Sequence, residues 1–294
     1  MKTLKFAASI CLILFAAVLL TPAKAYAAPS GIHTGTKSEI DTNGSGSAYI
    51  RVRSLGSNPK RLKVRVEVLN KVYTYDLSNT GSWDTFPLQF GSGKYVIKVF
   101  EQIEGTRYSV IQNQTVTASY KNPNQPFLIP TQTVNFDSKS AAAAKARELT
   151  KKCKNDLAKV KAIYQFIIKN ITYDTATAAN VKSGEVTSYI PSPDRTIKNK
   201  KGICFDYSSL MAAMLRSVGI PTKVVTGYVS PKNTYHAWNE VYIKNKGWVK
   251  VNGSFYFDGV KYSRMDPTFG AGGKNGKLTA YIGNAKNYKV QYVY

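Results

Sequence analysis

The chain has 294 residues, 43% of them hydrophobic, and a formal net charge of +24. This length allows two ordinary domains. The basic residues are spread along the sequence and no nucleic-acid-binding signature occurs, so a nucleic-acid partner is excluded from the prediction. The positive charge favours binding to an extracellular polyanion, such as an anionic cell-wall polymer. An equal alternative is that the charge only keeps the protein soluble.

The first 27 residues have the pattern of a signal peptide. Two lysines precede an apolar stretch over residues 6–20, and small residues around Ala25 and Ala27 provide a cleavage site. The apolar stretch is short for a membrane span, so no span is predicted after signal removal, with a retained N-terminal anchor as the alternative. Removal of residues 1–27 takes away three lysines and no acid, which leaves +21. We predict a secreted, extracellular protein with cell-wall association.

Two segments of different character follow. Residues 28–47 are rich in Gly, Ser and Thr and predict a flexible leader. Over residues 48–135, β-branched and aromatic residues alternate with polar ones, as in residues 62–68 and 95–100, and turn residues separate the runs. This pattern predicts a β-sandwich domain, immunoglobulin-like in type, although no Cys-Trp-Cys core signature is present.

Residues 138–294 predict an α+β domain. Residues 140–150 are alanine-rich and residues 155–171 carry apolar side chains at helical spacing, so both segments predict helices. Residues 172–201 show no clear long element. Because they lead directly to the candidate site, we expect them to line a substrate cleft.

Cys204 stands where a loop becomes a helix, which is predicted over residues 203–218. Unpaired backbone N–H groups and the helix dipole favour the thiolate there, and the thiolate is the form that attacks carbonyls. Asp206 in the same turn is predicted to be a helix-dipole partner and not a catalytic acid. Cys153 lacks a matching histidine and is predicted to pack at a helix boundary, although one bridge between the two cysteines is an alternative.

Two predicted strands, residues 222–229 and 235–243, follow this helix, and the second carries His236. The chain has two histidines, and His33 lies in the polar N-terminal segment. His236 is therefore the candidate base for Cys204, and a third group must orient its ring.

Three motifs in order resemble the transglutaminase-like superfamily in its bacterial secreted form: Gly-x-Cys-x-Asp-Tyr-Ser at 202–208, His-Ala-Trp-Asn-Glu-Val-Tyr at 236–242 and Met-Asp-Pro-Thr-Phe at 265–269. The resemblance covers roughly residues 162–294 and implies a papain-like core. It implies that Cys204 is the nucleophile, His236 the general base and acid, and Asp266, on a neighbouring strand, the orienter.

The orienter has an alternative. The family usually has tryptophan four residues before the aspartate, where this chain has Tyr262, whereas Trp248 lies four residues before Asn252. Papain-like enzymes use asparagine in this role. We favour Asp266, because Asn-Gly and Asp-Gly hairpin signals flank residues 254–257, and such a hairpin would return the chain beside the histidine strand.

The predicted chemistry is acyl transfer through a thioester on protein or peptide amide groups. An amine acceptor would make the protein a transglutaminase, and water would make it a cysteine peptidase or amidase. The Cys204 backbone N–H would hold the oxyanion. Tyr189 and Trp238 are candidates for a second oxyanion donor or for walls of the cleft. Pro191 is a further candidate for a cleft wall. Trp238 fits core packing equally well.

No cofactor is predicted, because there is no acidic cluster of the calcium-loop type and two histidines do not favour a zinc site. The predicted partner is a protein or peptide substrate at the cell surface. The competing hypothesis is a non-catalytic cell-wall-binding or structural protein that uses the same fold as a scaffold. In a third hypothesis, the protein is a protein-processing enzyme that binds its substrate through the N-terminal domain.

Overall fold

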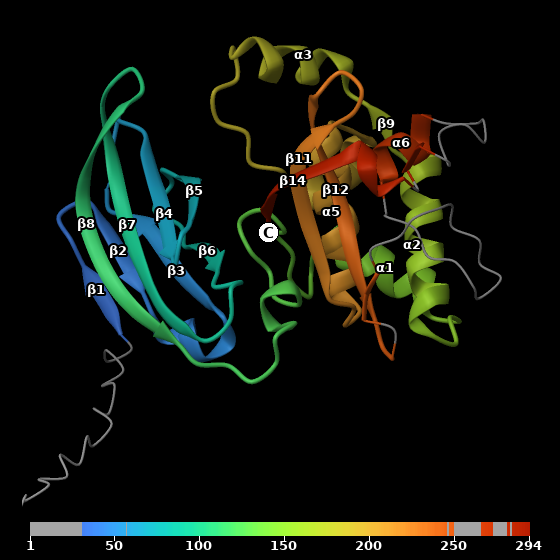
Figure 1. The fold of residues 1–294 in the computed structure, drawn as a ribbon, viewed down its shortest axis with the longest axis horizontal. Helices are drawn as coiled ribbons and strands as arrows, with labels where there is room; N and C mark the ends of the chain where they lie inside the picture. The colour runs from blue at the N-terminus through green and yellow to red at the C-terminus, as the bar shows by residue number, and fades with distance from the viewer. Residues whose placement is uncertain (1–30, 57, 246, 250–265, 273–280, 283) are drawn as a thin grey trace, which may run out of the picture.

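The computed structural model describes residues 31–294 except 57, 246, 250–265, 273–280 and 283. The predicted signal peptide therefore lies outside the described residues. Among the helices of this described part, none is both long and apolar enough to cross a membrane. A unit of strands and a unit of mixed helices and strands lie side by side (Figure 1).

The N-terminal β unit contains strands β1 to β8 in two antiparallel sheets, with orders β1-β2-β3-β6 and β5-β4-β7-β8. The strands are β1 (Ile32–Thr34), β2 (Ser38–Asp41), β3 (Tyr49–Ser54), β4 (Leu62–Val68), β5 (Lys71–Leu77), β6 (Asp84–Pro87), β7 (Gly93–Glu104) and β8 (Arg107–Ala118). Both sheets contribute to one apolar core, with Ile50 from the first sheet and Val64 and Ile97 from the second. Its immunoglobulin-like character stays a prediction.

The predicted flexible leader over residues 28–47 is wrong for its described part. Residues 32–47 form β1, β2 and the 3₁₀ helix η1 (Asn43–Ser47), and β2 pairs with β3. Ser38 and Ile40 are fully buried in the β unit. Strands of three and four residues are too short to show a period, and their stability comes from pairing with distant strands, so composition alone does not reveal them.

The C-terminal α/β unit is built around helix α5. Its helices are α1 (Ala141–Thr150), α2 (Asp156–Asn170), α3 (Thr175–Ser183), α4 (Pro193–Asn199), α5 (Cys204–Ser217) and α6 (Pro267–Gly272). Its strands are β9 (Thr172–Tyr173), β10 (Lys201–Gly202), β11 (Thr222–Val229), β12 (Thr234–Ile243), β13 (Gly247–Val249) and β14 (Tyr288–Val293), and short 3₁₀ helices are η2 (Gln125–Phe127) and η3 (Ala285–Asn287). These bounds confirm the predicted helices α1, α2 and α5 and strands β11 and β12.

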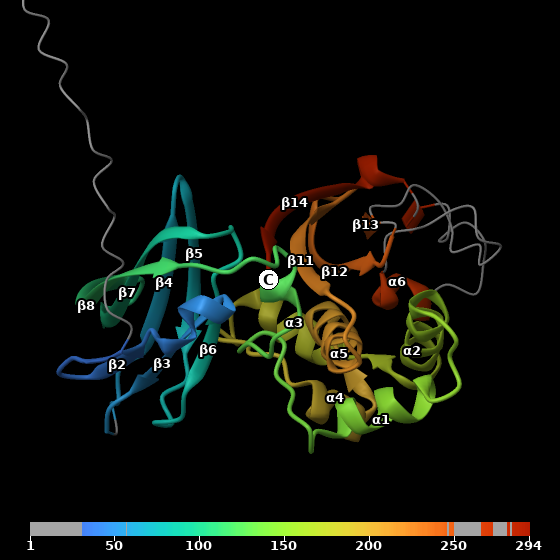
Figure 2. The ribbon, with the colours of Figure 1, turned by 90° about the horizontal axis from the view of Figure 1, so that it is seen from below.

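Helix α5 lies between an antiparallel sheet of order β13-β12-β11-β14 and the helices α1, α2 and α4 (Figure 2). All its residues from Asp206 to Arg216 are buried. Most of these residues are apolar and belong to the core cluster of the unit, and Ala212 and Ala213 let neighbouring elements approach closely. The N-terminus of α5 is therefore held by the core of the unit.

Residues 172–201 contain more structure than expected. They form β9, α3, α4 and β10, and β9 and β10 make a parallel pair. Helix α3 has no buried residue, so its sequence shows no apolar stripe from which a helix could be predicted. Asp174 caps its N-terminus by accepting a hydrogen bond from the Thr177 N–H, and Gly184, with a positive φ, caps its C-terminus.

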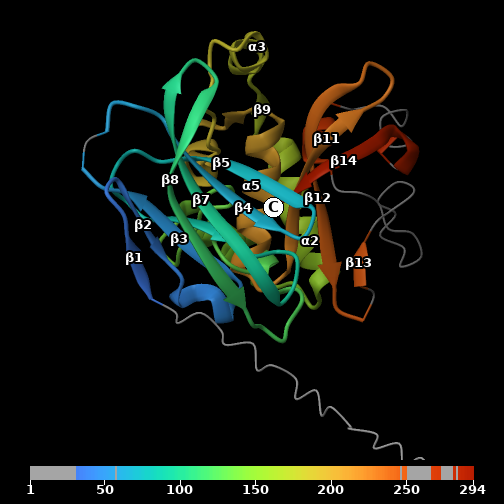
Figure 3. The same ribbon diagram turned by 60° about the vertical axis from the view of Figure 1, so that its left-hand side comes forward.

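The two units pack together through the C-terminal residues, and Arg216 ties these residues to the segment between the units. The ring of Tyr73 lies 5.2 Å from that of Tyr292 and 5.8 Å from that of Tyr294, between centroids. The buried Arg216 guanidinium donates to the carbonyls of Thr222 (2.9 Å), Ile129 (2.9 Å) and Tyr294 (3.1 Å), and burial lowers its pKa to about 9. Figure 3 shows the end of the last strand beside the N-terminal unit.

Candidate active site

Cys204 is the first residue of α5, directly after β10. The Asp206 carboxylate accepts a hydrogen bond from the Ile203 N–H at 2.9 Å, which closes the first turn of the helix. Gly202 has no room for a side chain, because a Cβ there would lie 2.6 Å from the Cβ of Asp206. The loop before Cys204 is thus tied to the helix it begins, which agrees with the helix-end role predicted for Asp206.

His236 lies on β12 and contacts Asp266. Its Nε2 is 2.7 Å from Oδ2 of Asp266, which also accepts the Tyr288 hydroxyl at 3.0 Å. Oδ1 of Asp266 accepts the Phe269 N–H at 3.0 Å, and this carboxylate is fully buried. Because an ionised carboxylate only accepts hydrogen bonds, Nε2 carries a hydrogen and Nδ1 is the nitrogen left to face Cys204.

The charge of His236 is set by opposing influences. Burial acts against the imidazolium, but the negative charge of Asp266 and hydrogen bonds to Asp266 and Cys204 outweigh it, and together they raise the pKa of His236 to about 10. The ring is therefore protonated at neutral pH. A cation in contact with Cys204 is the partner that a thiolate requires.

Aromatic rings hold the imidazole in place. The Phe269 ring stacks on His236 with centroids 4.4 Å apart and planes at 17°. Trp238, two residues along β12, is fully buried, and its ring packs edge-on against Tyr288 at 5.0 Å. Trp238 does not line the cavity at Cys204, so its contacts match the core-packing alternative and not an oxyanion donor.

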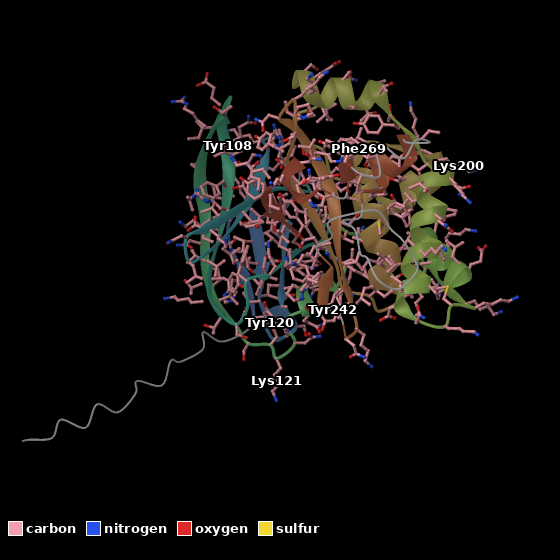
Figure 4. All side chains as sticks on the ribbon, turned by 45° about the vertical axis from the view of Figure 1, so that its right-hand side comes forward. Tyr108, Tyr120, Lys121, Lys200, Tyr242 and Phe269 are labelled. Carbon is pink, nitrogen blue, oxygen red and sulfur yellow. The ribbon has the colours of Figure 1, made fainter. Side chains whose placement is uncertain are left out.

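A cavity of 1020 Å³ lies over Cys204 and His236. It is mostly apolar and is lined by Ile168, Lys169, Ile171, Thr172, Tyr173, Cys204, Tyr207, Val229, Ser230, Pro231, Lys232, Thr234, Tyr235, His236, Thr268, Phe269, Ala271 and Tyr281. Figure 4 shows Phe269 on the C-terminal unit, at the far end of the molecule from Lys121. Cavities of this size are typical of binding sites.

Tyr189 and Pro191 do not line this cavity, contrary to the predicted cleft walls. The Tyr189 hydroxyl donates to Oδ2 of Asp206 at 2.5 Å, and Tyr189 lines a separate cavity of 340 Å³. The start of the same segment, Thr172 and Tyr173, lines the main cavity instead. The reason is the parallel pairing of β9 with β10, which sequence spacing does not reveal.

Of the two candidate orienters of His236, Asp266 is the one that lies among the described residues. Asp266 meets His236, whereas Asn252 lies outside the described residues, as do Tyr262 and the predicted hairpin around residues 254–257. Asp266 directly precedes α6, while the resemblance implied a position on a strand. The Tyr288 contact was not predicted, because it comes from β14 and leaves no local signal in the sequence.

Cys153 lies away from the site. Its Sγ is 3.7 Å from the carbonyl oxygen of Leu149, after the end of α1, and both Cys153 and Cys204 are free thiols. Within the described ranges of the chain, no group of three or more His, Cys, Asp or Glu side chains is arranged to hold a metal ion.

Comparison with known proteins places part of the chain in a family. Residues 143–253 match the model of the Transglutaminase-like superfamily. The chain is 33% identical over 121 residues to the uncharacterized protein YebA of Bacillus subtilis, an alignment that covers 35% of this chain and 16% of YebA. It is 32% identical over 74 residues to a protein-glutamine gamma-glutamyltransferase of Pseudomonas aeruginosa, which covers 21% of this chain and 11% of that protein.

In both cases the chain spans less than a fifth of the length of the curated relative. A solved structure from Cytophaga hutchinsonii, described as a candidate cysteine protease, is 17% identical with a TM-score of 0.39. That likeness covers 84% of this chain and 91% of the other.

Proposed function

Since this chain belongs to the transglutaminase-like superfamily, whose members include cysteine acyltransferases and proteases, we propose that it transfers acyl groups from protein or peptide amides through a thioester on Cys204. The observation that carries the proposal is the arrangement of Asp266, His236 and Cys204 in a row, with His236 in contact with both of the others. Asp266 fixes one ring nitrogen of His236, and the other meets a cysteine at a helix N-terminus in an open cavity.

Each residue has a role in this reaction. The Cys204 sulfur attacks the amide carbonyl carbon, and the His236 imidazolium gives its proton to the departing amine. The neutral imidazole then takes a proton from the acceptor, which is water or an amine, as the thioester is resolved. Asp266 holds the ring orientation and stabilises the imidazolium.

We assign the role of second oxyanion donor to Tyr173, in addition to the Cys204 backbone N–H. In the β9–β10 pair, Tyr173 is the register partner of Gly202, two residues before Cys204, and it lines the cavity. Burial, followed by the charges of Cys204 and Asp174, raises the pKa of Tyr173 to about 12, so the hydroxyl remains a donor. Other cavity tyrosines are engaged: Tyr207 donates to the Ile171 carbonyl and Tyr235 to the Thr226 hydroxyl.

Substitution Tyr173→Phe tests this assignment. Loss of one oxyanion donor lowers kcat by about 10²–10³-fold with little change in KM. Tyr235→Phe is the matched control, because it removes a hydroxyl from the same cavity that already has a partner. Equal activities of the two variants would assign the oxyanion to another donor.

The location and the role of the N-terminal unit complete the proposal. The signal-peptide pattern of residues 1–27 and the charge of +21 that remains after its removal support an extracellular protein that associates with an anionic cell-wall polymer. In this proposal the N-terminal β unit, of immunoglobulin-like type, brings the α/β unit to a protein substrate at the cell surface.

The first experiment is alkylation by iodoacetamide over pH 5 to 10, read by peptide mass spectrometry at both cysteines in wild type and in His236→Ala. Cys153 is an internal control, because it lies outside the cavity. We expect fast labelling of Cys204 near neutral pH, slower labelling in the variant and no change at Cys153.

Turnover then separates catalysis from a scaffold role. Wild type should release ammonia or amine from glutamine-containing peptides, and Cys204→Ala should not. Equal, slow labelling of both cysteines together with no turnover would reject the proposal in favour of the wall-binding scaffold.

A further inference from the structure

The cavity over Cys204 has charges of one sign on its rim. Among its described lining residues, the charged side chains outside the Cys204 and His236 pair are Lys169, near the end of α2, and Lys232, in the turn between β11 and β12. Both are exposed, and neither forms an ion pair with a residue that the structure describes. The rim therefore presents two ammonium groups to whatever enters.

Two described carboxylates beside the site, Asp266 and Asp174, do not balance these charges. Asp266 lies behind His236, fully buried, and its oxygens accept from His236, Tyr288 and Phe269. Asp174 caps α3 and pairs with Lys201 at 3.1 Å, and it lines the neighbouring cavity. Neither one faces Lys169 or Lys232 as a lining residue of the main cavity.

The two lysines differ in how well the fold explains them. Lys169 stands in the last turn of α2, where a cation is favoured by the helix dipole. Lys232 lies in a turn, outside any helix, and has no such partner. The ammonium group of Lys232 is therefore held by no partner that the structure describes and can pair with a charged group in the cavity.

Most of the remaining lining is apolar and aromatic, with four serine and threonine hydroxyl side chains among it. Ile168, Ile171, Val229, Phe269 and Tyr281 surround a volume of 1020 Å³, which is at the upper end of the range of about 300–1,000 Å³ that holds small ligands. This space fits aliphatic or aromatic side chains on either side of a reacting amide, with the lysine rim outside them.

We infer that the acyl donor is a peptide segment with an apolar residue beside the reacting carboxamide and an acidic side chain next to it, seated against Lys232 and Lys169. This inference rests on the proposed function, because it names the substrate class of the same site. Complementary charge at a partly desolvated rim contributes to selection among peptides and to the rate of encounter.

The test uses three carboxamide peptides that are identical except for Glu, Ala or Lys at the position flanking the apolar residue. Their affinities for Cys204→Ala are measured by fluorescence anisotropy, and their turnover is measured with the wild type. Lys232→Glu is then introduced in both backgrounds. Lys121→Glu is the matched control, because it makes the same change in net charge at an exposed position far from Phe269 (Figure 4).

We expect binding in the order Glu, Ala, Lys, with about tenfold between the first and the last. Lys232→Glu should remove or reverse this order, and Lys121→Glu should keep it. Equal affinities of all three peptides, or the same order in Lys232→Glu, would overturn the inference. Binding in the expected order without turnover would reject the acyl-transfer proposal alone, so the two failures are distinct.

Discussion

The most informative residue after Cys204 is Asp266, because three different elements meet at its carboxylate. His236 comes from β12, Tyr288 from β14, and the Phe269 N–H from α6. A neutral side chain of the same shape would keep some of these contacts but lose the charge that sustains the imidazolium.

Asp266→Asn should therefore slow the reaction of Cys204. We expect the rate of turnover to fall by about 10²–10⁴-fold, because the amide no longer fixes the ring tautomer or its charge. Kinetics on a peptide carboxamide would measure this loss. Tyr288→Phe removes one neutral hydrogen bond from the same carboxylate, and a comparable loss there would show that packing and not charge is responsible.

His236 makes a separate prediction about pH. Its pKa is raised to about 10 in the folded protein from an ordinary value of 6.5, so the folded state holds the proton more tightly than the unfolded state. The stabilisation is complete below about pH 6.5 and is lost as the pH rises through about 10. The difference in free energy of unfolding between wild type and His236→Gln, measured by urea denaturation, should shrink over this range. A difference that is constant with pH would contradict the charged pair.

Among the elements, strand β11 depends on a glycine. Gly227 is the register partner of His236 and lies beside β14 at a break in register, and a Cβ at Gly227 would lie 2.0 Å from the Lys289 carbonyl oxygen. Only a residue without a side chain lets β14 come this close, and β14 carries Tyr288 to Asp266.

Gly227→Ala should destabilise the protein by about 1–3 kcal/mol, because backbone atoms must move to make room. It should also slow Cys204 labelling, since Tyr288 and His236 shift with the strands. Gly46→Ala, at an exposed site where the nearest atom lies 3.9 Å from the added Cβ, should change neither quantity. Chemical denaturation and the alkylation rate measure the two effects.

Helices and strands with a regular spacing of apolar residues were predicted from the sequence, and elements without such a spacing were missed. Helix α5 and strands β11 and β12 were predicted within a residue or two, because apolar spacing and turn signals coincide there. Strands β1 and β2 and helix α3 were not predicted, since pairing and capping hold them and no apolar stripe does. Tyr189 was misplaced for a related reason, because the β9–β10 pairing joins residues far apart in the sequence, Thr172 with Lys201 and Tyr173 with Gly202.

On the scale of the whole molecule, Arg216 connects segments that are far apart in the chain. Its guanidinium reaches the segment between the units at Ile129, strand β11 at Thr222 and the final strand at Tyr294. Because the same final strand also packs on Tyr73, we predict that the two units unfold together.

Arg216→Met should lower the free energy of unfolding by at least about 2 kcal/mol, because buried carbonyls lose a donor. It should also split a single unfolding transition into two. Tryptophan fluorescence resolves the units, because Trp83 reports on the N-terminal unit and Trp238 and Trp248 on the other. Arg107→Met at the exposed β7–β8 turn is the control, and two transitions in the wild type would contradict the prediction.

The β9–β10 pair closes a long excursion of the chain beside Cys204. The chain leaves the neighbourhood of Cys204 at Tyr173 and returns at Lys201 beside its point of departure, so the intervening segment is a loop closed at its neck. Its first helix, α3, buries none of its side chains, and the carbonyl of Thr187 farther along accepts a hydrogen bond from Arg61 of the N-terminal unit. Because α3 adds no side chain to the core, we expect changes in its sequence and length to leave Cys204 in place.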